Sequence, residues 1–188
     1  MKRVVVAWGR FNPPTIGHQK LMDITKQTAG GDPFFIYPTH SFGGKKDDNG
    51  FKSNPLPADR KHFWLSKMFP QYRNNIIYDT SIKTIIQLFQ KYQADYDDIT
   101  LVAGDDQFEG YKSMVSKYNG VEYTYRSIEF VNAGKRDKKA AGAEGMSATK
   151  MRYAAATMAI GEFSLGMPKT LNDDDIMKLM VEVVSGLK

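Results

Sequence analysis

The stretch Val4-Val-Val-Ala-Trp8, followed by Gly9-Arg-Phe-Asn-Pro-Pro-Thr-Ile-Gly-His18, decides the fold. A short β-branched, apolar run that ends at a glycine predicts a strand buried on both faces. Residues 17–28 predict the helix that follows, and the pair Gly30-Gly31 predicts its end. A buried strand that leads into a helix is typical of the first unit of an α/β fold.

Short strands continue to alternate with helices along the chain. We expect strands at 33–37, 76–78 and 99–103 with one or two more in 121–131, and helices at 57–69, 81–92 (capped by Ser81), 107–118, 147–156 and 173–185. This order predicts a Rossmann-like, doubly wound parallel sheet with helices on both faces. Ligands of such sheets bind at the carboxyl ends of the strands.

Two segments depart from this alternation. Residues 41–57 are rich in Gly, Lys, Asp, Asn and Pro and have no apolar period, so they predict a long mobile loop rather than a regular element. Residues 157–188 predict a C-terminal helical extension. With 188 residues, we expect the whole chain, 1–188, to form a single domain.

Composition excludes several classes of function. The chain has no cysteine, which rules out disulfides, thiolate metal sites and cysteine nucleophiles. No apolar run approaches the roughly 20 residues that cross a bilayer, so we expect a soluble, cytoplasmic protein without a membrane partner. The net charge of +5 favours polyanionic partners, which include both nucleic acids and nucleotides.

The loop between the first strand and the first helix carries residues suited to a phosphate. Gly9 lets backbone N–H groups approach closely, and His18 adds a donor at a helix start, where the helix dipole favours anions. Thr15 offers a hydroxyl one turn earlier. The alternative is a tight proline turn with a half-buried histidine.

A second segment, Glu144-Gly-Met-Ser-Ala-Thr-Lys-Met-Arg152, opens a predicted helix. Ser147 and Thr149 are suited to cap this helix, and capping alone would explain them. With Arg152, however, the same turn offers hydroxyls, N–H groups and a guanidinium that together suit the β- and γ-phosphates of a nucleotide.

The two segments resemble, in the same order, the two signatures of the nucleotidylyltransferase superfamily. Residues 9–18 are similar to the glycine, aromatic, proline and His-x-Gly-His signature, with Thr15 in place of the first histidine. This Thr-x-Gly-His variant, with Asn-Pro before it, resembles the nicotinamide mononucleotide adenylyltransferases. Residues 147–152 resemble the Ser-x-Thr-x-x-Arg signature. The sequences of both segments are also similar to those of nucleotidylyltransferases encoded by bacteriophages. The host cytoplasm is the location expected for such a protein.

The resemblance implies transfer of a nucleoside monophosphate, AMP from ATP first of all, to a small phosphorylated acceptor such as nicotinamide mononucleotide, with release of pyrophosphate. It implies Mg²⁺ bound to the phosphates and not by protein side chains. The residues implied in catalysis are His18, Thr15 and Arg152. The residues implied in nucleotide binding are Gly9, Arg10, Phe11, Gly17, His18, Gly104, Asp106, Ser147, Thr149 and Arg152.

Further residues are weaker candidates. Five basic residues could contact the acceptor or belong to a lid over the phosphates: Lys20, Lys45, Lys46, Arg60 and Arg136. In the segment Gly104-Asp105-Asp106, Asp106 matches a family position near the ribose, whereas the same residues could equally cap an ordinary helix.

Three alternatives stay open. Residues 144–147 are similar to the second signature of the cytidylyltransferases, which use CTP. A nucleic-acid module could use the basic residues within 135–139 with Tyr123 and Tyr125 as stacking platforms, but acidic runs at 95–98 and 173–175 interrupt a basic stripe, so nucleic acid is not an expected partner. The third alternative is a scaffold on a retained fold. The sequence leaves the acceptor and a homo-oligomer undecided.

Overall fold

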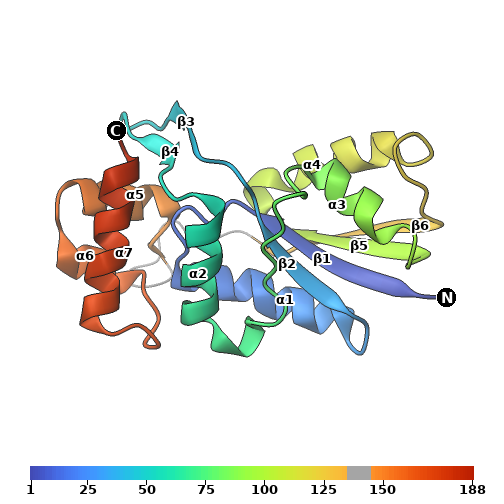
Figure 1. The fold of residues 1–188 in the computed structure, drawn as a ribbon, viewed down its shortest axis with the longest axis horizontal. Helices are drawn as coiled ribbons and strands as arrows, with labels where there is room; N and C mark the ends of the chain where they lie inside the picture. The colour runs from blue at the N-terminus through green and yellow to red at the C-terminus, as the bar shows by residue number, and fades with distance from the viewer. Residues whose placement is uncertain (135–144) are drawn as a thin grey trace. The chain divides into compact units, whose positions relative to one another are not determined.

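The computed structural model describes residues 1–134 and 145–188, and these residues form two compact units (Figure 1). The first unit is drawn from residues 1–9, 20–39 and 77–134. The second unit is drawn from residues 10–19, 40–76 and 145–188. The expectation of a single domain stays a prediction.

The first unit is built on a four-stranded sheet in the order β2-β1-β5-β6. Its strands are β1 (Arg3–Gly9), β2 (Phe34–Pro38), β5 (Asp98–Ala103) and β6 (Ser127–Asn132). All three pairings are parallel. Helices connect successive strands: α1 (Gln19–Ala29), α3 (Ile85–Tyr92) and α4 (Asp105–Tyr118). The predicted Rossmann-like parallel sheet is therefore confirmed, with the strand order reversing between β1 and β5.

Both faces of β1 are covered, as its sequence predicted. Val4 and Val6 are fully buried in a cluster with side chains of α3 and α4. Val5 and Ala7 point to the opposite face, because side chains alternate along a strand, and they too are fully buried. Figure 1 shows α3 and α4 over one face of the sheet and α1 across the other.

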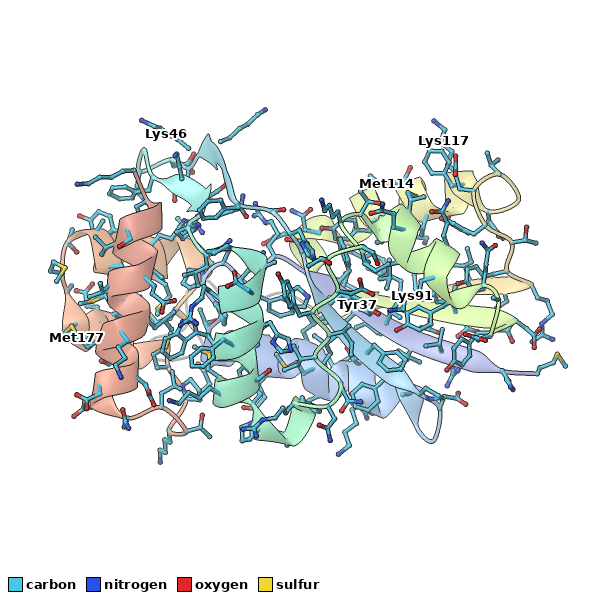
Figure 2. The ribbon with its side chains drawn as sticks, viewed as in Figure 1. Tyr37, Lys46, Lys91, Met114, Lys117 and Met177 are labelled. Carbon is cyan, nitrogen blue, oxygen red and sulfur yellow. The ribbon has the colours of Figure 1, made fainter. Side chains whose placement is uncertain are left out.

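Tyrosine hydroxyls in this core find polar partners. The hydroxyls of Tyr37 and Tyr92 lie 2.7 Å apart, and Figure 2 shows Tyr37 within the first unit. Tyr123 donates to the carbonyl of Val115, and Tyr125 donates to that of Phe89. Tyr123 and Tyr125 are only 2% and 3% exposed, so the idea that they form a stacking platform for nucleic acid is wrong. The core uses these rings for packing instead.

Two details differ from expectation. Helix α3 begins later than predicted, because Thr84 and not Ser81 is its N-cap and Gln87 completes a capping box. Residues 76–78 form no strand of the sheet, although the Ile77 amide donates to the carbonyl of Ile36. Of the one or two strands expected in 121–131, the structure has one, β6.

The second unit contains α2 (Ala58–Met68), α5 (Ala148–Ala156), α6 (Ile160–Leu165) and α7 (Asp173–Gly186), the short 3₁₀ helices η1 (Ile16–His18) and η2 (Pro70–Tyr72), and a hairpin of β3 (Gly43–Lys46) and β4 (Lys52–Asn54). Polar bonds fasten α7 to α2. The Trp64 indole N–H donates to Glu182 at 2.8 Å, and Lys67 pairs with Asp175 at 2.6 Å. The helical extension is thus part of the core of this unit.

The expectation of a loop without regular structure at 41–57 is wrong, because β3 and β4 pair in an antiparallel hairpin. The turn contains Asn49-Gly50, a common hairpin signal, and Gly50 has the positive φ of +79° that glycine adopts easily. Asp47 holds the turn: its carboxylate accepts from the amides of Asn49 and Phe51. Polar strands obscure the pattern, since neither strand alternates apolar with polar residues.

Candidate active site

The loop of residues 10–15 is fixed by buried backbone and amide bonds. The side chain of Asn12 donates to the carbonyl of Leu56 at 3.1 Å and accepts from the Leu56 amide at 2.8 Å. This reciprocal pair imitates a strand pairing and satisfies all four groups away from water. Phe11 precedes it with a φ of +46° and is 1% exposed, a backbone conformation that bulky residues adopt only where their surroundings enforce it.

His18 is held in one orientation by Thr15. The Thr15 amide donates to Nδ1 of His18 at 2.9 Å, and the ring of Phe11 lies 4.8 Å from the imidazole, centroid to centroid. Because a backbone N–H can only donate, Nδ1 must be the acceptor, which places the proton of the neutral ring on Nε2. The loop thus selects the tautomer that has an Nε2–H donor.

Thr15 itself is fully buried. Its hydroxyl lies 3.3 Å from Nδ1 of His18, facing the imidazole. The geometry therefore favours a role for Thr15 in orienting His18, whereas the sequence suggested direct contact with a triphosphate.

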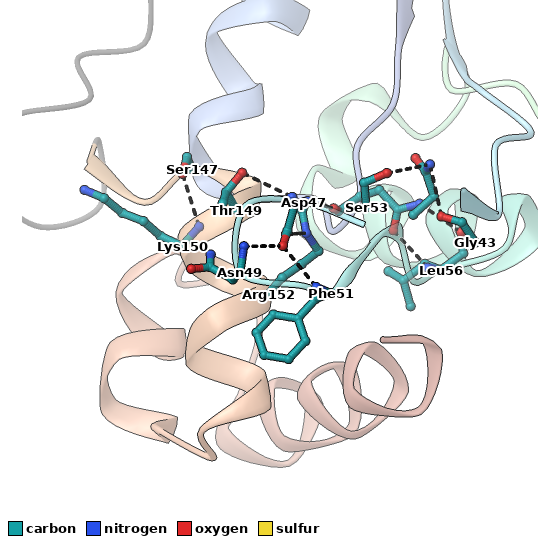
Figure 3. A network of polar contacts seen from close by, with 12 residues as sticks. Gly43, Asp47, Asn49, Phe51, Ser53, Leu56, Ser147, Thr149, Lys150 and Arg152 are labelled. Atoms are coloured by element: carbon teal, nitrogen blue, oxygen red, sulfur yellow. Dashed lines mark hydrogen bonds and ion pairs between the residues drawn. The ribbon is translucent and has the colours of Figure 1, made fainter. Parts of the chain in front are cut away.

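Arg152 joins the two motifs. From α5, its Nη1 donates to the carbonyl of Asn12 at 3.0 Å, and its Nη2 donates to the hydroxyl of Thr149 at 3.1 Å. Its Nε donates to the carboxylate of Asp47 at 2.9 Å (Figure 3). The Arg152 side chain is only 6% exposed, so three bonded partners compensate its burial.

The N-terminus of α5 is capped as predicted. The hydroxyl of Ser147 accepts from the Lys150 amide at 3.2 Å, as Figure 3 shows. Thr149 lies in the first turn, exposed, and spends its hydroxyl on Arg152. The first turn of α5 therefore combines a helix N-terminus, two hydroxyls and a guanidinium, which is a chemistry suited to an anion.

A cleft lies beside this turn. Its volume is about 510 Å³, and it is lined by Asn49, Met146, Thr149, Lys150, Tyr153, Glu162 and Leu165. The first-motif loop is also tied to this part of the unit, because the Ile16 amide donates to the carbonyl of Gly166 at 2.8 Å. Such a volume accommodates a small-molecule ligand.

Lys61 is a buried residue next to the first motif that sequence reasoning missed. It lies on α2 and is fully buried, and its ammonium donates to the carbonyls of Arg10 at 3.1 Å and Ser41 at 3.4 Å. Burial, and secondarily the charge of Arg10, lowers the pKa of Lys61 to about 7. Its position at helical spacing between Ala58 and Trp64, both buried, was the available signal.

The remaining candidates are distributed as follows. Gly9 ends β1 and accepts from the Thr39 amide, and Gly17 lies within η1. Arg10 and Lys20 are exposed. Lys45 and Lys46 are exposed on β3, as Figure 2 shows for Lys46.

Arg60 is committed elsewhere, in a bidentate pair with Glu182 and over the ring of Phe63. Arg136 lies outside the described residues, as do the other basic residues of 135–139.

Gly104 and Asp106 belong to the first unit, at the end of β5. Gly104 is the N-cap of α4, so neither Asp105 nor Asp106 caps the helix. Asp105 instead accepts from the side chain of Asn132 at 2.9 Å, and Asp106 is exposed.

Within 1–134 and 145–188, no group of three or more His, Cys, Asp or Glu side chains is arranged to hold a metal ion. In the same ranges, no helix is long and apolar enough to span a membrane.

Comparison with known proteins identifies relatives. A protein of Borrelia turicatae, named as a probable nicotinate-nucleotide adenylyltransferase, is 29% identical over 121 residues, which cover 59% of each chain. The chain therefore spans less than two thirds of the length of the curated relatives it matches.

Solved structures share the fold. The bifunctional NMN adenylyltransferase/ADP ribose pyrophosphatase of Francisella tularensis, complexed with AMP and a Mn ion, has a TM-score of 0.60 at 13% identity, covering 98% of this chain and 52% of that one. The nicotinic acid mononucleotide adenylyltransferase of Plasmodium falciparum, complexed with APC, has a TM-score of 0.57 at 11% identity, covering 97% and 98%. The family model described as cytidylyltransferase-like matches residues 6–154, and the chain thus belongs to the cytidylyltransferase-like family.

Proposed function

We propose that this protein transfers a nucleoside monophosphate, AMP from ATP first of all, to the phosphate of a small acceptor such as nicotinate or nicotinamide mononucleotide. One observation carries the proposal: the bond from Arg152 to the carbonyl of Asn12 brings the two signature segments together within one unit. The names of the relatives favour adenylyl transfer and a pyridine mononucleotide acceptor.

In the proposed reaction, an oxygen of the acceptor phosphate attacks the α-phosphorus of the triphosphate. The bond from that phosphorus to the oxygen bridging the α- and β-phosphates breaks, and pyrophosphate leaves with the bonding pair. The acceptor oxygen is already ionised at neutral pH, so no general base is required. Positioning and charge stabilisation are the contributions that the protein makes.

His18 stabilises the charge that grows on the α-phosphate. Its Nε2–H is the donor that the Thr15 amide selects by bonding Nδ1. A donor held at a fixed angle before substrate arrives needs no reorganisation during the reaction, and such donors contribute about 10²–10³ in rate. Thr15 acts through His18 as a positioning residue.

The first turn of α5 holds the leaving pyrophosphate. Ser147, Thr149 and the guanidinium of Arg152 supply donors there, and the dipole of a nine-residue helix favours the same anion. Gly9, Arg10, Phe11 and Gly17 supply the backbone of the neighbouring loop, while Gly104 and Asp106 stay candidates for the ribose. Lys20, Lys45, Lys46 and Arg136 stay candidates for the acceptor or a lid.

Mg²⁺ fits this site as a companion of the substrate. Within 1–134 and 145–188, no group of three or more His, Cys, Asp or Glu side chains could hold a metal ion. Oxygens of the triphosphate and water would therefore hold the ion. When bound, it neutralises phosphate charge.

The test is pyrophosphate release by the purified protein with Mg²⁺, each nucleoside triphosphate in turn, and a panel of acceptors. The panel contains nicotinate and nicotinamide mononucleotides, phosphopantetheine, glycerol phosphate and phosphocholine. We expect release with ATP and a pyridine mononucleotide, and its loss in His18→Ala. Release with CTP and an alcohol phosphate would instead establish a cytidylyltransferase. If the protein neither releases pyrophosphate nor binds a nucleotide, the result would favour the scaffold.

A further inference from the structure

Asp47 forms an ion pair with Arg152, the residue whose guanidinium the proposed function assigns to phosphate binding. Its Oδ2 accepts from Nε of Arg152 at 2.9 Å, and the two side chains are 9% and 6% exposed. The contact bridges β3–β4 and α5, 105 positions apart in sequence. An internal carboxylate therefore neutralises Arg152.

The rest of the Asp47 side chain is engaged in its own turn. Oδ1 accepts from the amides of Asn49 and Phe51, and the Asp47 amide donates to the carbonyl of Phe51 at 2.8 Å. Burial alone would raise the pKa of Asp47, but the bonds from Arg152 and from the turn amides outweigh it and lower the pKa below its usual value. The carboxylate is thus ionised at neutral pH.

The turn also covers the anion site. Asn49 lines the same cleft as Thr149 and Lys150, so residues 47–51 lie over the first turn of α5 (Figure 3). A phosphate that reaches Arg152 meets either a neutral ion pair or an adjacent negative charge. Both circumstances weaken its binding, because like charges within a few ångströms repel strongly at a site largely closed to water.

We propose that Asp47 is a built-in competitor for Arg152: the di- or triphosphate of the substrate must displace its carboxylate, and this exchange releases the turn 47–51 from α5. The inference rests on the proposed function and adds a residue that sets the affinity and the timing of phosphate binding. If the released state is about a tenth populated without ligand, the apparent affinity is reduced about tenfold.

The experiment measures binding of Mg²⁺-pyrophosphate and of ATP by calorimetry in the wild-type protein, Asp47→Asn, Asp48→Asn and Arg152→Ala. Asparagine keeps an Oδ1 for the amides of Asn49 and Phe51, while its Nδ2, which can only donate, replaces the charged acceptor that faces Nε of Arg152. Asp48 is the matched control, because it is an exposed carboxylate in the same turn. We expect Asp47→Asn to bind pyrophosphate about tenfold more tightly, with Asp48→Asn unchanged.

Equal or weaker pyrophosphate binding by Asp47→Asn overturns the competitor role, provided that the wild-type protein binds pyrophosphate and Arg152→Ala does not. That result would leave the proposed function intact. If neither the wild type nor Asp47→Asn binds, the proposed function fails and the competitor with it.

Hydrogen exchange of the wild-type protein needs no substitution. The amide of Phe51 bonds to Asp47, so it should exchange faster when pyrophosphate is bound. Slower exchange would contradict release of the turn.

Discussion

Nη1 of Arg152 donates to the backbone carbonyl of Asn12, 3.0 Å away and 140 positions earlier in the chain. The same Asn12 uses its side chain to fix the backbone of Leu56. The Arg152 side chain on α5 thereby anchors the loop of residues 10–15, which leads to His18. Removing that side chain should disturb both motifs together.

For catalysis, we expect His18→Ala to lower kcat by about 10²–10³ with little change in folding, because a donor used mainly in the transition state is lost. The matched control is His62→Ala, since His62, on α2, bonds to the carbonyl of Ile76 and has no assigned role in the reaction. The measurement is steady-state pyrophosphate release for both variants. A similar loss of kcat in both variants would contradict a catalytic role for His18.

The buried pair Arg152–Asp47 should show strong coupling in unfolding experiments. Arg152→Ala leaves the Asp47 carboxylate buried without its partner, and we expect a loss of about 3–5 kcal/mol in the free energy of unfolding. Adding Asp47→Asn to Arg152→Ala should restore part of that loss, with a coupling energy of about 1–3 kcal/mol. Urea titrations of the two single variants and the double variant measure it. Additive losses would mean that the pair contributes nothing beyond its separate contacts.

Lys61 should make stability depend on pH. Its pKa is about 7 in the folded protein and about 10.4 in an unfolded chain. Between these values the unfolded state binds more protons, so the free energy of unfolding should increase with pH, by up to about 1.4 kcal/mol per pH unit. Below pH 7 both states are protonated and this contribution is flat.

The comparison is between wild type and Lys61→Met, a side chain of similar length without charge. Urea unfolding at pH 6.5, 8 and 9.5 isolates the contribution of Lys61, since other titrating groups are common to both proteins. We expect the rise in the wild type to be steeper than in the variant. Parallel curves would show that Lys61 keeps an ordinary pKa.

Gly186 should tolerate no side chain. At the end of α7, a Cβ at this position would overlap the carbonyl oxygen of Pro55. We expect Gly186→Ala to destabilise the protein by about 1–3 kcal/mol, the range of overpacking. Gly110→Ala, inside α4 with no neighbouring atom near its Cβ position, should instead stabilise by about 0.5–1 kcal/mol. Thermal melts of both variants measure these changes. Equal shifts in melting temperature would contradict the close contact between Gly186 and Pro55.

Local patterns were enough for most of the fold. The run Val4–Trp8 predicted a doubly buried strand because its β-branched residues leave no polar face, and the helix of 173–185 followed from its apolar spacing and acidic first turn. The hairpin of 41–57 escaped because its strands are polar and only the Asn49-Gly50 turn signalled it. Helix α3 begins at Ile85, because Thr84 and Gln87 form a capping box that outweighs the serine upstream.

By itself the sequence determined the alternation of elements, the two signature segments and the residue types placed at helix N-termini, since these depend on neighbours in the chain. Only the tertiary structure decided that Thr15 is buried behind His18, that Arg152 reaches Asn12, and that Asp47 and Lys61 stand beside the motifs. Apart from Thr15 and His18, which are neighbours in the chain, those relationships join residues that are 51 to 140 positions apart. Burial and the geometry of hydrogen bonds select them, and neither is encoded in any short stretch.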